Sequence, residues 1–350
     1  MRDRSEAKGR VGVGVIGGSG YTGAELLRYL CVHPRVEILW VTANTKVGEE
    51  IGKVLPNLRG FVPGAFLPLE AARERLAEAR AVFVSLPHNE SQKVIPALVE
   101  RAPGAAFIDL AGDFRTNDPE GYRRYYGCEH AAPEWLPRFV YGFPEYLRDK
   151  IRGSKLIANP GCFATALNLS LAPLAAAGRL SGDVCVTGVT GSSGSGNRPS
   201  EATHHPERAA NFRAYKVLAH QHLLEVGAFL RTLGEGEYRL RFVPQSGPFV
   251  RGIFTTLFAP GIGARELEDI FRGAYDGEDL VTVTRGSPDL RLVQGTPRAL
   301  IGVDGSAECG IVFSATDNLG KGAAGQAIQN MNLALGFPET EGLRVPGGFV

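Results

Sequence analysis

Long apolar runs are missing from this 350-residue sequence. No segment approaches the roughly 20 consecutive apolar residues that a membrane-spanning helix needs, so we expect neither a transmembrane segment nor a membrane partner. The charge is also nearly balanced, with 38 basic and 37 acidic side chains and a formal net charge of +1. That balance gives no indication of nucleic acid as a partner.

Cysteine pairs are missing as well. The five cysteines are an odd number and none belongs to a CxxC motif, which argues against a disulfide framework and a zinc knuckle. The pattern is typical of a reducing, cytoplasmic compartment. The first ten residues are charged and lack the apolar segment of a secretory signal, so we interpret them as a tail.

The hydrophobic pattern changes along the chain, whose length suits two domains. Up to about residue 160, short apolar strands alternate with helices, beginning with RVGVGVI and YTGAELLRYL. This alternation predicts a doubly wound parallel, Rossmann-like sheet. Further on, DVCVTGVTG, YRLRFVPQS and RGIFTTLFA predict an α+β domain with a mainly antiparallel sheet, and the last helix should stop at Gly336.

A glycine-rich turn separates the first strand from the first helix. Its glycines would let the backbone approach a pyrophosphate, and the helix N-terminus would offer free N–H groups. The turn therefore predicts a dinucleotide site, the alternative being a tight turn needed only for packing. The residues expected to bind the cofactor here are Gly17, Gly18, Ser19, Gly20, Tyr21, Thr22 and Gly23.

The end of the second strand indicates which dinucleotide is bound. An NAD site would carry an acidic residue there to hold the ribose 2′-hydroxyl. Thr42 and Asn44 are neutral and Lys46 is cationic, which favours the 2′-phosphate of NADP. Lys46 could instead be merely solvated, and Glu49 lies close enough in sequence to weaken the preference.

Cys162 is the candidate nucleophile. It follows Asn-Pro-Gly and begins a long apolar helix, whose N-terminus would lower the pKa of the thiol and favour the reactive thiolate. Most cysteines are buried fillers, and Cys31, Cys185 and Cys309 fit that description because they lie inside apolar patterns.

Two histidines are candidates for the proton transfer that such a thiol needs. His220 and His222 are two residues apart near a helix start, so we expect only one of them to face the thiol. His204 and His205 lack matched ligand spacing, and we expect no metal site. A thiol beside a nicotinamide indicates reduction of an acyl phosphate through a thioester, with phosphate leaving and an aldehyde as product.

Several motifs together resemble the N-acetyl-γ-glutamyl-phosphate reductase family, which is related to aspartate-semialdehyde and glyceraldehyde-phosphate dehydrogenases. They are GGSGYTGAELLR, DLAGDFR, YGFPE, ANPGCFATA, RAYKVLAHQH, RGIFTTLF and DNLGKGAAGQAIQNMNLALGFPETEGL. The resemblance covers residues 11 to the C-terminus. It implies an NADP domain formed by residues 1–160 and 318–350, a catalytic and dimerisation domain over residues 161–317, and a homodimer or homotetramer.

The resemblance also implies roles for individual residues. It makes Cys162 the nucleophile and favours His220 as the acid/base, because Arg213 precedes it by seven residues. Ser192, Gly194 and Asn318 would contribute to the cofactor site, Asn318 near the nicotinamide amide. The expected substrate-binding residues are His222, Arg115, Arg213, Lys216 and Arg251. Arg115 and Arg251 could instead form internal salt bridges, Arg115 with Asp113.

One departure from the family pattern bears on the substrate. Acetylglutamyl-phosphate reductases usually read HRH followed by Thr-Pro-Glu, whereas this chain reads HQHLLEV. That version is similar to the lysine branch, which reduces 2-aminoadipate 6-phosphate attached to a small acidic carrier protein. Arg198 and Arg208 lie in a long loop that also leads to Arg213 and Lys216, and these positive charges would attract such a carrier.

Other readings stay open from the sequence alone. The substrate could be N-acetylglutamyl phosphate of arginine biosynthesis, carrier-bound glutamyl phosphate, or more than one of these. An aspartate-semialdehyde dehydrogenase is a third possibility. A non-enzymatic alternative is an NADP-binding sensor on a dehydrogenase scaffold, in which Cys162 and the histidines would be idle.

Overall fold

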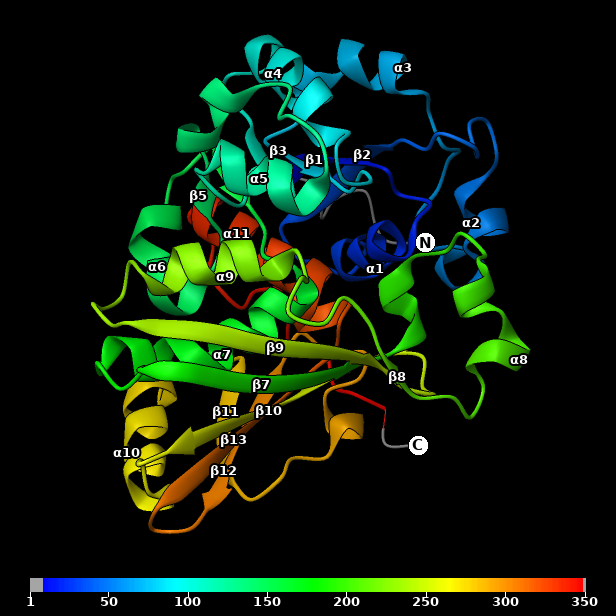
Figure 1. Ribbon diagram of the computed structural model, residues 1–350. Coiled ribbons are helices and arrows are strands. Elements are labelled where there is room, and N and C mark those ends of the chain that lie inside the picture. Colours follow the sequence, from blue (N-terminus) through cyan, green and yellow to red (C-terminus); the bar gives the residue numbers. More distant parts are fainter. Residues whose placement is uncertain (1–8, 349–350) are drawn as a thin grey trace. The chain divides into compact units, whose positions relative to one another are not determined.

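A computed structural model describes residues 9–348 of the chain (Figure 1). Most of the charged tail expected at the N-terminus lies outside this range. The chain forms two compact units. The first contains residues 9–117, 130–159 and 324–344, and the second contains residues 118–129, 160–323 and 345–348. Relative to the boundaries expected from sequence, the second unit also takes residues 118–129, 160, 318–323 and 345–348, which were expected in the first.

The first unit is built on six strands that pair in parallel throughout. In spatial order they are β2 (Val36–Val41), β1 (Val11–Ile16), β3 (Ala81–Val84), β4 (Ala106–Asp109), β6 (Leu156–Ala158) and β5 (Val140–Tyr141). All four residues of β3 are buried, as expected for a strand covered on both faces. Because the strand order reverses at β1, the turn after β1 lies at the switch point where such sheets bind ligands.

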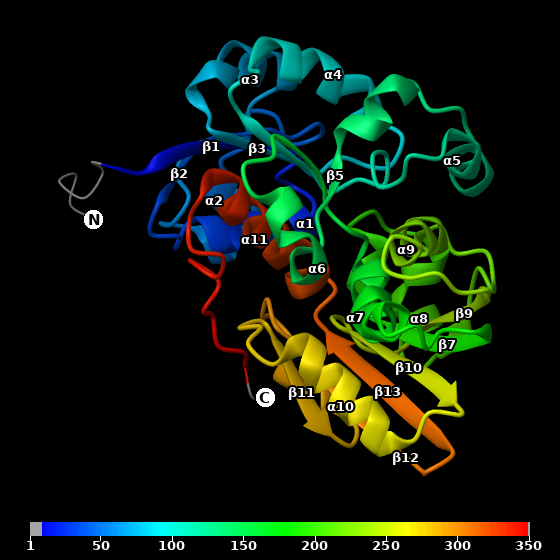
Figure 2. The same cartoon turned by 90° about the vertical axis from the view of Figure 1, so that its left-hand side faces the viewer.

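Helices cover both faces of this sheet, as Figure 2 shows. On one side lie α1 (Tyr21–Leu30), α6 (Pro144–Ile151) and α11 (Gly325–Leu335), and on the other α3 (Leu69–Glu74) and α4 (Ser91–Arg101). A short helix, α2 (Ile51–Val54), follows β2. The expected return of the chain to this sheet is made by α11, which ends at Gly336 in the left-handed conformation with φ 72°. The doubly wound parallel fold is confirmed.

The second unit is built on seven strands. In spatial order they are β11 (Val281–Arg285), β12 (Ala299–Gly305), β13 (Cys309–Thr316), β10 (Ile253–Pro260), β7 (Gly182–Thr190), β9 (Tyr238–Ser246) and β8 (Arg213–Ala214). Two pairings, β11–β12 and β7–β9, are parallel and the other four are antiparallel. The predicted α+β domain with a mainly antiparallel sheet is therefore confirmed.

One face of this sheet is covered by helices and the other carries half-exposed apolar side chains. The helices of the unit are α5 (Pro119–Tyr126), α7 (Cys162–Ala176), α8 (His205–Arg208), α9 (His222–Leu230) and α10 (Ala264–Tyr275). The hydroxyl of Tyr275 in α10 donates to the carbonyl of Leu169 in α7 at 2.8 Å. Along β10, Leu257 is buried beneath the helices, whereas Phe258 points to the other face and is 47% exposed.

The minor cysteines do not all lie where the sequence placed them. Cys185 was expected to be a buried filler, but it is exposed, and Cys31 and Cys309 are only partly buried. The prediction for Cys185 is wrong because side chains of β7 alternate between the two faces of the sheet, and Val184 and Val186 take the buried positions.

Within residues 9–348, no helix has both the length and the apolar character that a membrane crossing requires.

Candidate active site

Cys162 is the first residue of α7, directly after the turn that ends β6. Gly161 precedes it in an extended conformation, with no side chain capping the helix. The first N–H groups of α7 and the positive end of its dipole therefore meet at the cysteine, where they stabilise a thiolate. Cys162 is partly exposed.

The two histidines lie against the residues on either side of Cys162. His222 begins α9, and its Nε2 would be only 2.3 Å from a Cβ built on Gly161. The His220 ring meets the Phe163 ring edge-on at 5.5 Å. Both histidines are buried, and the two rings are 4.6 Å apart. The structure thus brings Cys162, His220 and His222 together.

Glu225 joins this group, although the sequence reasoning did not single it out. Its carboxylate is 2% exposed; Oε2 accepts the backbone N–H of Gly161 at 3.1 Å, and Oε1 is 4.0 Å from His222 Nε2. Glu225 lies three residues after His222 in α9. Because helix residues three apart share a face, the spacing in HQHLLE was the signal that could have found it.

Tyr215 is a second residue that the sequence reasoning missed. Its backbone N–H donates to the carbonyl of Pro244 at 3.0 Å, and its ring meets His220 edge-on at 5.9 Å. Burial raises the pKa of the Tyr215 hydroxyl, the charge of Cys162 raises it further, and Arg208 partly offsets both effects. The hydroxyl therefore stays protonated and can act as a hydrogen-bond donor beside the cysteine.

Two expected substrate-binding arginines make internal contacts. Arg115 is buried and donates to the carbonyls of Asn159 and Leu110, both at 2.7 Å, so it holds the turn that leads to the cysteine. Arg251 forms a two-pronged salt bridge with the fully buried Asp317, with both N–O distances at 2.9 Å. The internal salt bridge considered for Arg251 is therefore present, with Asp317 as its partner.

The basic residues of the long loop differ in exposure. Arg198, Arg213 and Lys216 are exposed. Lys216 has a left-handed backbone with φ 42°, and its Nζ donates to Gln221 at 2.8 Å. Arg208 is half-buried, and its guanidinium donates to the Ser246 hydroxyl and to the carbonyls of Gly247 and Thr190.

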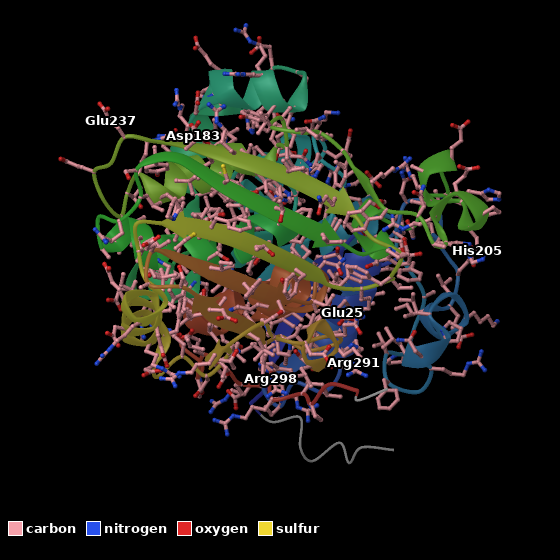
Figure 3. The ribbon with its side chains drawn as sticks, turned by 60° about the horizontal axis from the view of Figure 1, so that its bottom comes forward. Glu25, Asp183, His205, Glu237, Arg291 and Arg298 are labelled. Carbon is pink, nitrogen blue, oxygen red and sulfur yellow. The ribbon has the colours of Figure 1, made fainter. Side chains whose placement is uncertain are left out.

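The Arg208 contacts fasten α8 to the ends of β7 and β9. Figure 3 shows His205 of α8 at the end of the sheet opposite Asp183 and Glu237.

The expected cofactor residues of the second unit lie together. The Asn318 side chain donates to the Ser193 hydroxyl at 2.9 Å and accepts from the Gly252 N–H at 2.7 Å. Ser192 donates its N–H to the carbonyl of Phe249 at 2.9 Å, and Gly194 is exposed. The Asn318 side chain thus connects the loop that follows β7 to the loop that precedes β10.

The glycine turn of the first unit fits a dinucleotide. Gly17 has φ +82°, and a Cβ on it would lie 2.2 Å from the Ser85 carbonyl. A Cβ on Gly23 would lie 2.4 Å from the Gly17 carbonyl, so only glycine allows α1 to start this close to the turn. No side chain caps α1, which leaves its first N–H groups for an anion such as a pyrophosphate.

The end of β2 supports the same turn. Thr42 is buried, accepts the Gly17 N–H at its hydroxyl at 3.2 Å, and accepts the Gly18 N–H at its carbonyl at 2.8 Å. Asn44 is exposed, and Lys46 pairs with Glu49 at 3.1 Å on the surface. A cation is therefore present after β2, and its contact with a ribose 2′-phosphate stays a prediction from the sequence.

Comparisons with known families agree with both units. Residues 12–154 match the family described as "Semialdehyde dehydrogenase, NAD binding domain", and residues 162–318 match "Semialdehyde dehydrogenase, dimerisation domain". Aspartate semialdehyde dehydrogenase II from Vibrio cholerae shares the fold, with a TM-score of 0.72, 18% identity, and 93% of this chain and 98% of that chain covered. The enzyme from Candida albicans, solved with NADP, has a TM-score of 0.66, 16% identity, and coverage of 93% and 98%. The chain is thus of the semialdehyde dehydrogenase class.

Curated relatives narrow the class. An N-acetyl-gamma-glutamyl-phosphate reductase from Methanopyrus kandleri is 44% identical, with 96% of this chain and 98% of the relative covered. A "[LysW]-L-2-aminoadipate/[LysW]-L-glutamate phosphate reductase" from Sulfurisphaera tokodaii is 39% identical, with 95% and 98% covered. The chain belongs to the N-acetyl-γ-glutamyl-phosphate reductase family, an oxidoreductase family of amino-acid biosynthesis.

Family membership confirms three predictions made from the sequence: the enzyme class, the nicotinamide dinucleotide cofactor and the family itself. The sensor reading is not supported, because the matching relatives are phosphate reductases. The names of these relatives give three different substrates, so the family alone leaves the acyl group open.

Proposed function

We propose that this enzyme reduces an acyl phosphate to a semialdehyde through a thioester on Cys162. The observation that carries the proposal is the position of Cys162 at the start of α7, with buried histidines against both of its chain neighbours. A helix N-terminus stabilises the thiolate form of the cysteine, and an imidazole can donate and accept the proton that the reaction transfers.

The chemistry follows from these groups. The Cys162 thiolate attacks the carbonyl carbon; the sulfur–carbon bond forms while the bond to the phosphate oxygen breaks, and phosphate leaves with the electron pair. A reduced nicotinamide, when bound, would supply the hydride that converts the Cys162 thioester to a thiohemiacetal. An imidazolium protonates the oxygen as it gains charge, and the same ring takes this proton back when the aldehyde forms and Cys162 leaves as the thiolate.

We place His222 rather than His220 as the acid/base. The sequence favoured His220 through its spacing from Arg213, but the contacts support the other ring. His222 packs on Gly161, and the Glu225 carboxylate lies 4.0 Å from its Nε2, where the negative charge stabilises the protonated ring. His220 accepts the His222 backbone N–H at its Nδ1 and lies on the Phe163 side.

We propose NADPH as the cofactor, bound at the glycine turn of the first unit. The glycine turn would hold the pyrophosphate on the N–H groups of α1, and Lys46 would pair with the 2′-phosphate by releasing Glu49. Ser192, Gly194 and Asn318 stay cofactor-binding residues predicted from the resemblance.

For the acyl group, we propose 2-aminoadipate 6-phosphate linked to a small acidic carrier protein. Arg198, Arg213 and Lys216 are exposed around the loop that leads to His220. Phe212, Val217 and Leu218 add exposed apolar surface to the same segment, with exposures of 55, 52 and 48%. A small acetylated substrate needs neither feature, whereas an acidic protein would be recognised by both.

The second candidate substrate is N-acetylglutamyl phosphate. It is favoured by the 44% identity to a relative that carries this name, against 39% for the relative named for the carrier-bound substrates. The two candidates share the Cys162 chemistry. They differ in what is attached to the amino group and in side-chain length, because aminoadipate has one more methylene than glutamate.

A direct comparison of substrates tests the assignment. Acetylglutamyl phosphate and carrier-linked aminoadipyl phosphate are offered separately, and kcat/KM is measured for each. We expect the carrier-linked compound to be better by at least about tenfold, and equal or lower efficiency would assign the acetylated substrate instead. Arg198→Gln should slow only the carrier-linked reaction, and more at low salt than at high salt. The matched control is Arg298→Gln, on an exposed arginine just before β12.

We propose further that the enzyme works in the cytoplasm as a homo-oligomer. The free cysteines fit a reducing compartment. The sheet face that carries Phe254, Phe258, Ile311 and Phe313 supports association of two copies through the second unit.

A further inference from the structure

Arg208 and Arg213 share Ser246 as a neighbour, and neither has an acidic partner among the described residues. Arg208 donates to the Ser246 hydroxyl, and Arg213 lies directly opposite Ser246 where β8 pairs with β9. In the stretch 9–348, no carboxylate pairs with either guanidinium. Burial lowers the pKa of Arg208, and the neighbouring charge of Arg213 lowers it further.

The positive charges of two neighbouring guanidinium groups repel each other, and this repulsion is not offset when no anion is bound. Two guanidinium groups close enough to repel each other gain stability when a doubly charged ligand lies between them. Most other arginines of this unit already have an acid; Arg239 and Arg241 share Asp183, and Arg285 pairs with Glu268. The region around Ser246 is therefore suited to bind an anion.

Tyr215 links this region to Cys162. Burial and the charge of Cys162 raise the pKa of the Tyr215 hydroxyl, and the charge of Arg208 lowers it. Its ring rests on His220, which itself packs on Phe163, the residue after the nucleophile. An anion at the arginines would therefore lie on the Tyr215 side of the sulfur, and the neutral hydroxyl can donate a hydrogen bond to it.

We propose that Arg208, Arg213 and Tyr215 bind the phosphate group of the acyl phosphate. This rests on the proposed function, since only an acyl-phosphate substrate places a phosphate one oxygen away from the attacked carbon. A phosphate dianion matches two guanidinium groups better than a single carboxylate does. When the carbon–oxygen bond breaks, the leaving oxygen gains negative charge, and the three donors stabilise it there.

The role of Arg208 differs from the one expected from sequence. It was expected to contact a carrier protein, but its guanidinium faces Ser246, Gly247 and Thr190 within the sheet. These bonds fix its position before the substrate arrives, so the phosphate site is partly preorganised. Arg213 is exposed and has no such bonds, which makes it the better residue for substitution.

Protection of Cys162 from alkylation tests the proposal without the cognate substrate. The full-length protein is treated with iodoacetamide, and the modified fraction of Cys162 is followed by mass spectrometry at increasing inorganic phosphate and constant ionic strength. We expect phosphate to slow alkylation in the wild type and in Arg298→Gln. Figure 3 labels Arg298 and shows it away from α8 and His205. In Arg213→Gln, about tenfold more phosphate should be needed for half-protection.

Tyr215→Phe provides a second variant that keeps the ring packing on His220 and loses only the hydroxyl. It should raise the phosphate concentration for half-protection about threefold or more. Equal protection in the wild type and Arg213→Gln, or no protection by phosphate in the wild type, would overturn the proposal. So would protection by glutarate without protection by phosphate, because the site would then take a carboxylate. Reductase turnover by Cys162→Ser would instead overturn the proposed function itself.

Discussion

Gly161 and Glu225 are joined by a buried hydrogen bond, from the glycine N–H to the carboxylate Oε2 at 3.1 Å. One carboxylate thereby contacts both the turn that presents Cys162 and the imidazole of His222. Because Glu225 holds two parts of the same site, its substitution should affect the reaction more than the fold.

Glu225→Gln should lower kcat about tenfold or more. The amide oxygen can still accept the Gly161 N–H, so the protein should fold, but the negative charge that stabilises the protonated His222 is lost. The limb of the pH–rate profile that belongs to the histidine should also move to lower pH. Glu237→Gln, on an exposed residue just before β9, is the control. An unchanged pH profile with full activity would remove Glu225 from the mechanism.

Gly161→Ala should impair activity through geometry alone. Its Cβ would lie 2.3 Å from His222 Nε2, so the ring or the turn must move. We expect kcat to fall at least about tenfold, since a displacement of this size misplaces the proton donor. Gly273→Ala, in α10 with open space around it, is the matched control and should be as active as the wild type. Comparable activity of both variants would contradict the geometry.

The architecture could be predicted from the sequence because hydrophobic periodicity is a local signal. The alternation of strand and helix before residue 160 and the helix stop at Gly336 were both visible in short segments. The exposure of Cys185 was not, because an apolar strand such as DVCVTGVTG does not show which of its faces is covered.

The candidate site could be predicted in part. Cys162 could be predicted as the nucleophile because the Asn-Pro-Gly turn and the helix start after it lie next to it in the sequence, and a helix N-terminus lowers the pKa of a thiol. Glu225 and Tyr215 could not, since their roles depend on contacts across the fold: Glu225 reaches Gly161, 64 residues earlier in the chain. Arg251 remained ambiguous for the same reason, because its partner Asp317 lies 66 residues further on.

Lys46→Ala tests the preference for NADP. Loss of the cation should reduce kcat/KM for NADPH about tenfold and leave the value for NADH nearly unchanged, because only NADPH carries the 2′-phosphate. Lys53→Ala is the matched control, since Lys53 also forms a surface pair with a nearby glutamate, Glu50. A similar decrease in kcat/KM with NADPH and with NADH would mean that Lys46 does not bind the 2′-phosphate.

Asp109 gives the first unit a predictable response to pH. It is fully buried at the end of β4, and its Oδ2 shares the Ser91 hydroxyl with Asp113, at 3.0 and 2.9 Å. Burial, with the charge of Asp113 added, raises the pKa of Asp109 to about 7. The folded protein therefore holds a proton that the unfolded chain has released, between the ordinary carboxyl pKa of about 4 and about 7.

It follows that the contribution of Asp109 to the free energy of unfolding falls as the pH rises through this window. Asp109→Asn cannot ionise and should escape the loss. We expect its Tm, relative to the wild type, to be higher at pH 8 than at pH 5, as measured by thermal unfolding. Asp149→Asn, on an exposed residue of α6, should show no such dependence. A difference in Tm that is independent of pH would show that Asp109 does not titrate in this range.

The central claim is that the acyl group is transferred to Cys162, and mass spectrometry of the intact protein tests it most directly. The enzyme is mixed with acyl phosphate in the absence of NADPH, quenched in acid and digested. We predict that the peptide containing Cys162 carries the mass of the acyl group as a thioester, that added NADPH removes it with release of the aldehyde, and that Cys162→Ser carries no such adduct and does not turn over. Full turnover by Cys162→Ser, or an adduct on another residue while Cys162 stays unmodified, would contradict the account.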